Sequence, residues 1–171
     1  AMNRQVLLAS RPQGPVTEDN FRTVDTPVGV PGEGEVLVKN EWLSLDPYMR
    51  GRMNDVKSYV PPVQIGEVMV GQTVGEVVAS GDSRFAVGDK VLAASGWQLY
   101  GVARADEVYR IDATRAPASC YLGVLGMPGM TAWFGLLEIG QPKAGETVVV
   151  SGAAGAVGQS CKSCHDAYRK D

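Results

Sequence analysis

Histidine and cysteine are scarce in this sequence. Its 171 residues include one histidine, His165, and three cysteines. A structural zinc site takes four ligands, most often cysteine and histidine, so the absence of histidine before position 165 argues against such a site in most of the chain. An odd number of cysteines, two of them in the last eleven residues, does not form a disulfide framework. We therefore expect a protein of the reducing cytoplasm without a structural metal.

Long apolar runs and a strong net charge are also missing. No run approaches the roughly 18 apolar residues that a membrane-spanning helix needs. The N-terminus lacks the basic and apolar regions of a signal peptide. The net charge of −3 gives no electrostatic footprint for nucleic acid. Because 44% of the residues are hydrophobic, a packed core is possible. We expect no membrane or nucleic-acid partner.

Short β-type runs dominate the first 115 residues. Glycine and proline are abundant, at 21 and 10 residues, and separate stretches rich in apolar and β-branched residues. These stretches are RQVLLAS, EVLVKNEWLSL, VMVGQTVGEVVAS, GDKVLAA and GVARADEVYRID. Gly71 and Gly75 inside one of them predict β-bulges or barrel corners. Many short strands at this spacing are typical of a barrel or a sandwich.

The pattern changes near Ala116. The stretch Thr131–Gly140 has the apolar spacing of a helix, and Gly140 followed by Pro142 predicts its end. The continuous β-branched run in Gly145–Gly152 predicts a strand that is buried on both faces. The predicted fold class is therefore mainly β with an α/β end: a barrel-like domain, a helix, and the opening strand of an α/β unit.

A glycine-rich turn follows this predicted strand. Ala153-x-Gly155-x-x-Gly158 matches the G-x-G-x-x-G fingerprint of dinucleotide-binding proteins, with alanine in the first position. Gly155 would let the backbone approach a pyrophosphate, and Gly158 would let the helix pack closely on the strand. A tight turn without a ligand is the alternative. Because a βαβ unit needs roughly 30 residues and the sequence ends at Asp171, we expect the nucleotide-binding unit to be truncated.

Four stretches of the sequence carry a family resemblance. They are LSLDPYMRGRM, VGEVVASGDSRFAVGDKV, GWQLYGVA and GMPGMTAWFGLLEIGQPKAGETVVVSGAAGAVGQ. Together they resemble the zinc-independent, NADP-dependent branch of the medium-chain dehydrogenase/reductase superfamily, with its prostaglandin reductases, leukotriene B4 12-hydroxydehydrogenase and alkenal double-bond reductases. The resemblance implies a GroES-like domain over residues 1–125 and the start of a truncated Rossmann unit over residues 126–159. Residues 160–171 form an atypical tail.

The resemblance also implies an activity and a set of site residues. The activity is NADPH-dependent reduction of activated C=C bonds in α,β-unsaturated aldehydes and ketones, carried out in full-length members by homodimers. Tyr48 would line the substrate pocket as the catalytic residue, and Met127 and Thr131 would lie beside the nicotinamide. The pyrophosphate would bind at Ala153, Ala154, Gly155, Ala156, Val157 and Gly158. Because residues expected to bind the adenosine ribose are missing, we expect weak NADPH binding or none by this chain alone.

Each implied role has a purely structural alternative. Tyr48 fits a packed aromatic residue with its hydroxyl satisfied, and Met127 fits a residue that fills the core. Thr131 fits the N-terminal cap of the following helix. Asp46 and Arg50 fit a turn cap and a surface ion pair. These alternatives depend on burial and on the residue at which the helix begins.

The tail carries a second signal. Cys161, Cys164 and His165 form the C-x-x-C-H pattern that attaches c-type haem, with the histidine as iron ligand. The stretch VGQSCKSCHDAYRKD also resembles the C-terminal end of cytochrome c′. A foreign sequence joined after Gln159, an adventitious metal site and a Cys161–Cys164 disulfide are the alternatives. An electron-transfer haem protein and a non-catalytic GroES-like fragment therefore stand beside the reductase hypothesis.

Overall fold

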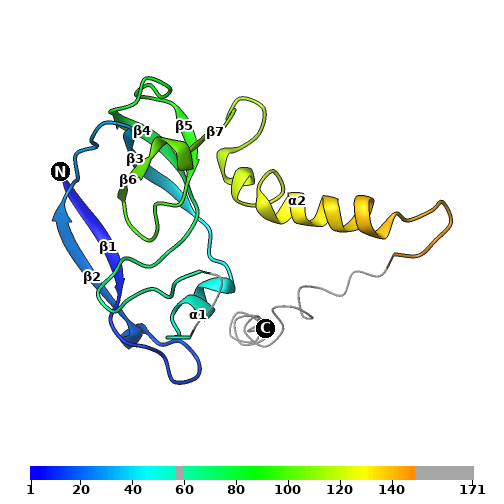
Figure 1. The fold of residues 1–171 in the computed structure, drawn as a ribbon, viewed down its shortest axis with the longest axis horizontal. Coiled ribbons are helices and arrows are strands. Elements are labelled where there is room, and N and C mark those ends of the chain that lie inside the picture. The colour runs from blue at the N-terminus through cyan, green and yellow to red at the C-terminus, as the bar shows by residue number, and fades with distance from the viewer. Residues whose placement is uncertain (57–59, 149–171) are drawn as a thin grey trace.

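In the computed structural model, which describes residues 1–56 and 60–148, strands dominate the first part of the chain and helices the last (Figure 1). The strands are β1 (Met2–Leu8), β2 (Phe21–Pro27), β3 (Glu35–Leu43), β4 (Thr73–Ser80), β5 (Lys90–Ala93), β6 (Tyr100–Arg104) and β7 (Tyr109–Arg110). The helices are η1 (Glu18–Asn20), α1 (Tyr48–Arg52), η2 (Ala105–Glu107), η3 (Ala118–Leu122), α2 (Met127–Trp133) and η4 (Phe134–Gly140), of which η4 is a π-helix. The predicted mainly β class is confirmed.

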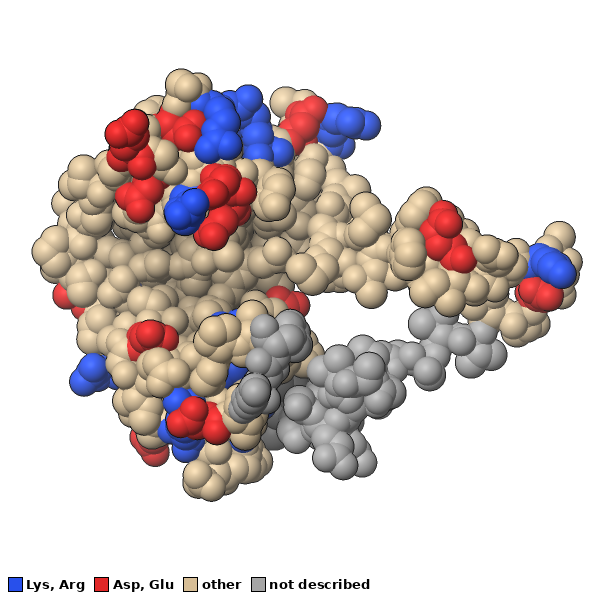
Figure 2. Space-filling model, in the orientation of Figure 1, with Lys and Arg blue, Asp and Glu red and all other residues tan. Residues whose placement is uncertain are grey.

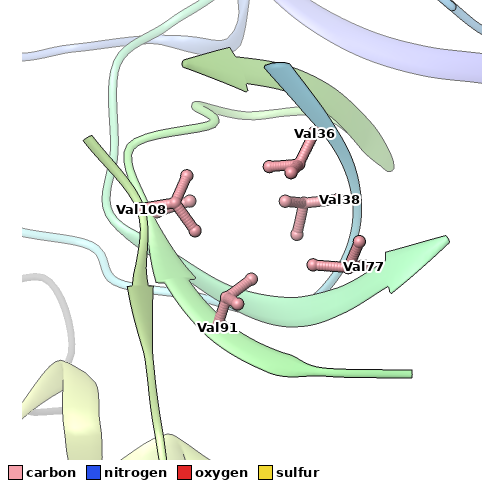
Figure 3. Packing of buried hydrophobic residues seen from close by; sticks show 6 residues of the cluster. Val36, Val38, Val77, Val91 and Val108 are labelled. Atoms are coloured by element: carbon pink, nitrogen blue, oxygen red, sulfur yellow. The ribbon is translucent and has the colours of Figure 1, made fainter. Parts of the chain in front are cut away.

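The larger sheet has five antiparallel strands in the order β6-β3-β4-β5-β7. It curls around a core of valines that point toward one another (Figure 3). The buried members are Val36, Val38, Val77, Val91, Ala93 and Val108. Three consecutive residues are buried in β3, Val36–Val38, and three in β4, Thr73–Gly75, so both strands are covered on both faces over part of their length. This core holds the sheet in its barrel-like shape.

A bulge in β3 bends this sheet. Asn40 pairs with Gly75 and Trp42 pairs with Val74, so Glu41 is the extra residue. A Cβ atom at Gly75 would overlap the carbonyl oxygen of Lys39 on the facing strand. Glycine therefore allows the two backbones to approach closely at the bulge. The predicted irregularity at Gly75 is confirmed.

The strands β1 and β2 form a separate two-stranded sheet, with Met2 opposite Pro27 and Leu8 opposite Phe21. It is attached to the rest of the fold through isolated bridges of Gln5 with Gln98 and of Leu7 with Val68. Beneath it lies a second buried cluster that holds α1. Its members are Leu8, Met53, Val63 and Met69, with Phe21, Val70 and Trp97 packed against them.

The predicted helix at Thr131–Gly140 is confirmed, but it begins earlier. Gly126 is the residue that precedes the first turn, and Pro128 lies within that turn, where its missing N–H costs nothing. The alternative of Thr131 as the N-terminal cap is therefore wrong, because Thr131 lies inside α2. The chain leaves the helix at Gln141, which has a left-handed backbone with φ of 45°.

The predicted strand at Gly145–Gly152 is not formed in its described part. Gly145 has φ of 89° and belongs to a turn, and residues 146–148 have no strand partner. The Val148 side chain is 49% exposed rather than buried on both faces. A β-branched run becomes a central strand only where neighbouring strands pair with it. The remainder of this run lies outside the described residues.

Candidate active site

Tyr48 is the first residue of α1, the short helix that follows β3. Pro47 precedes it with a helical backbone, and the Met49 N–H donates to the Asp46 carbonyl oxygen at 3.0 Å. Met49 is buried, whereas Tyr48 is 41% exposed. The helix is therefore anchored by one residue while its neighbour reaches the surface. Tyr48 is thus only partly packed, and both its predicted catalytic role and the alternative of a packed aromatic residue with a satisfied hydroxyl stay predictions.

A close-packed floor lies beneath α1. A Cβ atom at Gly71 would come within 2.7 Å of Leu43 Cδ1 and 3.0 Å of Met49 Cε. Trp97 lies on the same side, with its ring stacked on Phe21 at a centroid distance of 5.4 Å. Because glycine adds no side chain, β3, α1 and the Trp97 loop meet without a gap. This close packing fixes the position of α1 relative to the β domain.

Two arginines hold the loops around α1. Arg11 donates to the carbonyl oxygens of Met53 at 2.8 Å and Val63 at 3.2 Å. Arg50 donates to Asn54 Oδ1 at 2.6 Å and to the Gly14 carbonyl oxygen at 2.8 Å. Such charge-assisted bonds to backbone carbonyls join segments far apart in the sequence.

These contacts correct the expectation of a surface ion pair at Arg50. Its guanidinium ties α1 to the loop after β1, while Asp46 contributes its carbonyl oxygen to the turn before α1. Sequence reasoning also missed Arg11, because its partners lie 42 and 52 residues away and leave no local pattern. A fixed backbone at α1 limits where the Tyr48 side chain can reach.

The carboxyls with a lowered pKa lie elsewhere. Hydrogen bonds from the Arg84 side chain lower the pKa of Asp82 to about 2. The pKa of Asp89 is lowered by the Ala86 N–H and by Arg110. Both carboxyls cap turns between β4 and β5, so they stabilise loops rather than serve chemistry. The pKa of Lys90 is raised by its bonds to Glu41 and Glu76, which join β3, β4 and β5 across the bulge.

Met127 and Thr131 lie on α2, one helical turn apart. Met127 is 66% exposed, so its alternative role as a core residue is wrong in this structure. A shallow, mainly apolar hollow at the start of α2 has neither Met127 nor Thr131 in its lining, which is formed by Val124, Leu125, Gly126, Gly129, Met130 and Trp133. A Cβ atom at Gly126 or Gly129 would overlap the carbonyl oxygen of Tyr121 or Val124. The two glycines therefore let the chain fold tightly at the start of α2 and shape the hollow.

The other predicted site residues lie outside the described part of the chain. They are the turn residues Ala153, Ala154, Gly155, Ala156, Val157 and Gly158, and the tail residues Cys161, Cys164 and His165. Within residues 1–56 and 60–148, no three cysteine, histidine or carboxylate side chains gather as a metal site. The same residues contain no helix long and apolar enough to cross a bilayer.

An antiparallel sheet curled around a valine core, with a glycine-shaped turn leading into an apolar helix, is consistent with the N-terminal domain of a medium-chain dehydrogenase/reductase. The family model described as "N-terminal domain of oxidoreductase" matches residues 4–111. The chain belongs to this family.

The chain is also similar in sequence to curated NADP-dependent reductases. The chain is 54% identical over 156 residues to the NADPH-dependent curcumin reductase of Escherichia coli, covering 91% of this chain and 45% of that protein. It is 43% identical over 162 residues to the NADP⁺-dependent 2-alkenal reductase of Nicotiana tabacum, covering 92% and 47% of the two proteins. The chain thus spans about half the length of the curated relatives it matches.

Solved structures agree. The crystal structure of CurA from Vibrio vulnificus matches with a TM-score of 0.80 and 53% identity, over 91% of this chain and 46% of that one. The structure of CurA from the same organism in complex with NADPH matches with a TM-score of 0.79 and 52% identity, over the same shares. The similarity covers both the β domain and the helix that follows it.

Proposed function

We propose that this chain is the substrate-side half of an NADPH-dependent reductase that acts on C=C bonds conjugated to a carbonyl group. The observation that carries the proposal is the 54% identity to a reductase named for NADPH and curcumin. The 2-alkenal reductase relative supports the same substrate class, an activated double bond next to a carbonyl. The match to a CurA structure in complex with NADPH supports the cofactor.

The described residues fit a nicotinamide ring. Met127 and Thr131 are both exposed and lie i, i+4 on α2, so they share one side of the helix. Met127 and Thr131 would hold this ring, and residues 153–158 of the glycine-rich turn would take the pyrophosphate. When bound, NADPH supplies a hydride to the β-carbon of the substrate.

Tyr48 would serve the carbonyl end of the substrate. Its hydroxyl would donate a hydrogen bond to the carbonyl oxygen, which gains negative charge as the enolate forms. The Arg11 and Arg50 contacts would keep α1 in place, so that the hydroxyl is positioned before the substrate binds. Protonation of the α-carbon by water then completes the reduction. The β-carbon gains a hydride, which carries two electrons, and the α-carbon gains one proton from the solvent.

A chimeric enzyme tests the proposed function. Residues 1–159 of this chain replace the corresponding part of the E. coli curcumin reductase, and NADPH consumption is followed by absorbance with a panel of enals and enones. We expect substrate-dependent NADPH oxidation and a product saturated at the C=C bond. A folded chimera that oxidises NADPH with none of these substrates would refute the proposed function.

The same chimera tests the role of Tyr48. We expect Tyr48→Phe to lower kcat roughly 100-fold, because one hydrogen-bond donor to the developing oxyanion is lost. Tyr109→Phe is the matched control, since Tyr109 is an exposed tyrosine on β7. A kcat for Tyr48→Phe within twofold of the parent value would show that the hydroxyl does not stabilise the enolate.

A further inference from the structure

Arg52, the last residue of α1, has a partly buried side chain that the fold does not use. Its Nε atom is buried and has no hydrogen-bond partner. Within residues 1–56 and 60–148, the only other arginines that are not exposed are Arg11 and Arg50. Both donate to backbone carbonyl oxygens, and Arg11 also pairs with Asp55 at 3.8 Å. Two of these three guanidinium groups therefore hold loops in place, and that of Arg52 does not.

Charged side chains elsewhere on the β domain commonly form pairs of opposite sign. In the space-filling view, blue and red atoms lie next to one another on this domain (Figure 2). Arg84 pairs with Asp82 at 2.8 Å, and Arg104 pairs with Asp106 at 2.7 Å. A guanidinium with a buried and unpartnered nitrogen has lost contact with water without gaining an acceptor, which costs free energy. A ligand that brings an acceptor to Arg52 would remove this cost.

The position of Arg52 on α1 indicates which ligand this is. Tyr48 and Arg52 are the first and last residues of the helix, at i and i+4, so their side chains share one side of it. The acidic residues nearest in sequence, Asp46 and Asp55, form no ion pair with Arg52, and Asp55 is paired with Arg11. Side chains one turn apart start about 5–6 Å from each other. A molecule bound by both would therefore carry a carbonyl oxygen and an anionic group a similar distance apart.

We propose that Arg52 binds a carboxylate group of the substrate, so that the enzyme favours unsaturated oxo acids over neutral enones of the same size. A guanidinium donates two parallel hydrogen bonds to a carboxylate, and a ketone offers no matching pair of charged oxygens. In 4-oxo-2-pentenoate, one trans C=C bond separates the ketone from the carboxylate, which is close to the required span. The choice of an unsaturated oxo acid rests on the proposed function, whereas carboxylate binding at Arg52 can be measured without catalysis.

Binding is tested on the chain itself, without NADPH, using levulinate, the product of reducing the double bond of 4-oxo-2-pentenoate. The backbone amide of Gly51, next to Arg52 on α1, is followed by NMR as levulinate is added. We expect a saturable shift with levulinate and a response roughly tenfold weaker with neutral hexane-2,5-dione, because hydrogen bonds to charged groups contribute this much. Arg52→Met should abolish the shift, and Arg52→Lys should weaken it, because an ammonium group lacks the planar fork.

Two controls separate binding from folding. Because the guanidinium of Arg52 has no partner within the described residues, Arg52→Met should leave the thermal midpoint of the chain unchanged. Arg22→Met removes an exposed arginine from β2 and should leave the levulinate shift intact. No shift with levulinate, equal responses to levulinate and the dione, or an unchanged shift in Arg52→Met would each overturn the proposal. An equal response to inorganic phosphate would also overturn it, because Arg52 would then bind anions in general.

The chimeric enzyme tests the effect on specificity. In Arg52→Met, KM for 4-oxo-2-pentenoate should rise roughly tenfold, whereas KM for neutral 3-hexene-2,5-dione and both kcat values should stay within about twofold. A parallel rise of both KM values would show a general structural role, and an unchanged KM for the oxo acid would show no role in binding; either result would overturn the proposal. A chimera inactive with every substrate, beside levulinate binding that depends on Arg52, would refute the proposed function alone.

Discussion

Asn3 connects the small sheet to the large one through three hydrogen bonds, and its loss should destabilise the fold. Its amide nitrogen donates to Gln98 Oε1 at 3.0 Å and to the Tyr100 carbonyl oxygen at 2.8 Å. Its amide oxygen accepts from the Tyr100 N–H at 2.9 Å. The Asn40 N–H donates to the Leu99 carbonyl oxygen, so Asn40 and Leu99 form a hydrogen-bonded pair. The next pair, Lys39 and Tyr100, is then not hydrogen-bonded, and the backbone N–H and carbonyl groups of Tyr100 point away from β3. Asn3 is the partner that satisfies them.

The magnitude follows from these contacts. Asn3 is 4% exposed, so water does not readily replace its side chain. A typical hydrogen bond contributes about 1 kcal/mol, and a buried partner left unpaired costs more. Asn3→Ala should therefore lower the free energy of unfolding by about 3 kcal/mol. Gln98 Oε1 still accepts a hydrogen bond from Gln5 Nε2 at 2.7 Å in the Asn3→Ala variant. Only the backbone N–H and carbonyl oxygen of Tyr100 are therefore left without a partner.

Urea unfolding measured by tryptophan fluorescence tests this value. Asn3→Asp should also destabilise, because the carboxylate can accept from the Tyr100 N–H but cannot donate to its carbonyl oxygen. Gln64→Ala is the control, since this exposed amide makes one bond to the Pro62 carbonyl oxygen, and its effect should stay within about 0.5 kcal/mol. If Asn3→Ala costs less than about 1 kcal/mol at an unchanged m-value, the reasoning is wrong.

Two further predictions concern the bulge and the acid stability. Gly75→Ala should cost about 1–3 kcal/mol, because its Cβ would overlap Lys39 O. Gly51→Ala on α1 should be neutral or stabilising, because a Cβ atom at Gly51 would have no atom within 4 Å. Equal losses in the free energy of unfolding for Gly75→Ala and Gly51→Ala would refute the argument. Asp82, whose pKa of about 2 lies below its usual value of 3.8, stabilises the fold above about pH 4 and loses this effect as the pH falls toward 2. Arg84→Ala should return the Asp82 pKa toward 3.8 in a carboxyl NMR titration, and an unchanged pKa would contradict the assigned cause.

The strands with strong local patterns could be predicted from the sequence. β3, β4 and β5 lie within the expected runs, and β1 overlaps its run but begins earlier, at Met2 rather than Arg4. Apolar residues of these strands contribute to the two cores. β2 was missed. Its sequence, FRTVDTP, is largely polar, and it becomes a strand by pairing with β1 rather than through its own apolar face. Pairing with a distant segment leaves little trace in local composition.

In the candidate site, too, residues with a local sequence motif could be predicted, whereas contacts between distant segments could not. Tyr48 was predicted from a motif, and the structure places it at the exposed start of α1. The contacts of Arg11 and Arg50 that fix α1 join segments 36 to 52 residues apart, so no spacing rule could reveal them. Met127 was predicted as a cofactor contact or a core residue; its 66% exposure contradicts the core role, and the cofactor contact stays a prediction. Local chemistry is thus readable from sequence, whereas the support around it depends on tertiary contacts.

The effect of replacing a glycine by alanine depends on what surrounds the glycine in the fold. At Gly75 a Cβ atom would overlap a backbone carbonyl of the chain, so alanine should destabilise it. At Gly135 a Cβ atom meets open space, so the same substitution should strengthen the isolated helix by about 0.5–1 kcal/mol. The two substitutions are chemically identical, and their opposite expected signs come from the surroundings alone.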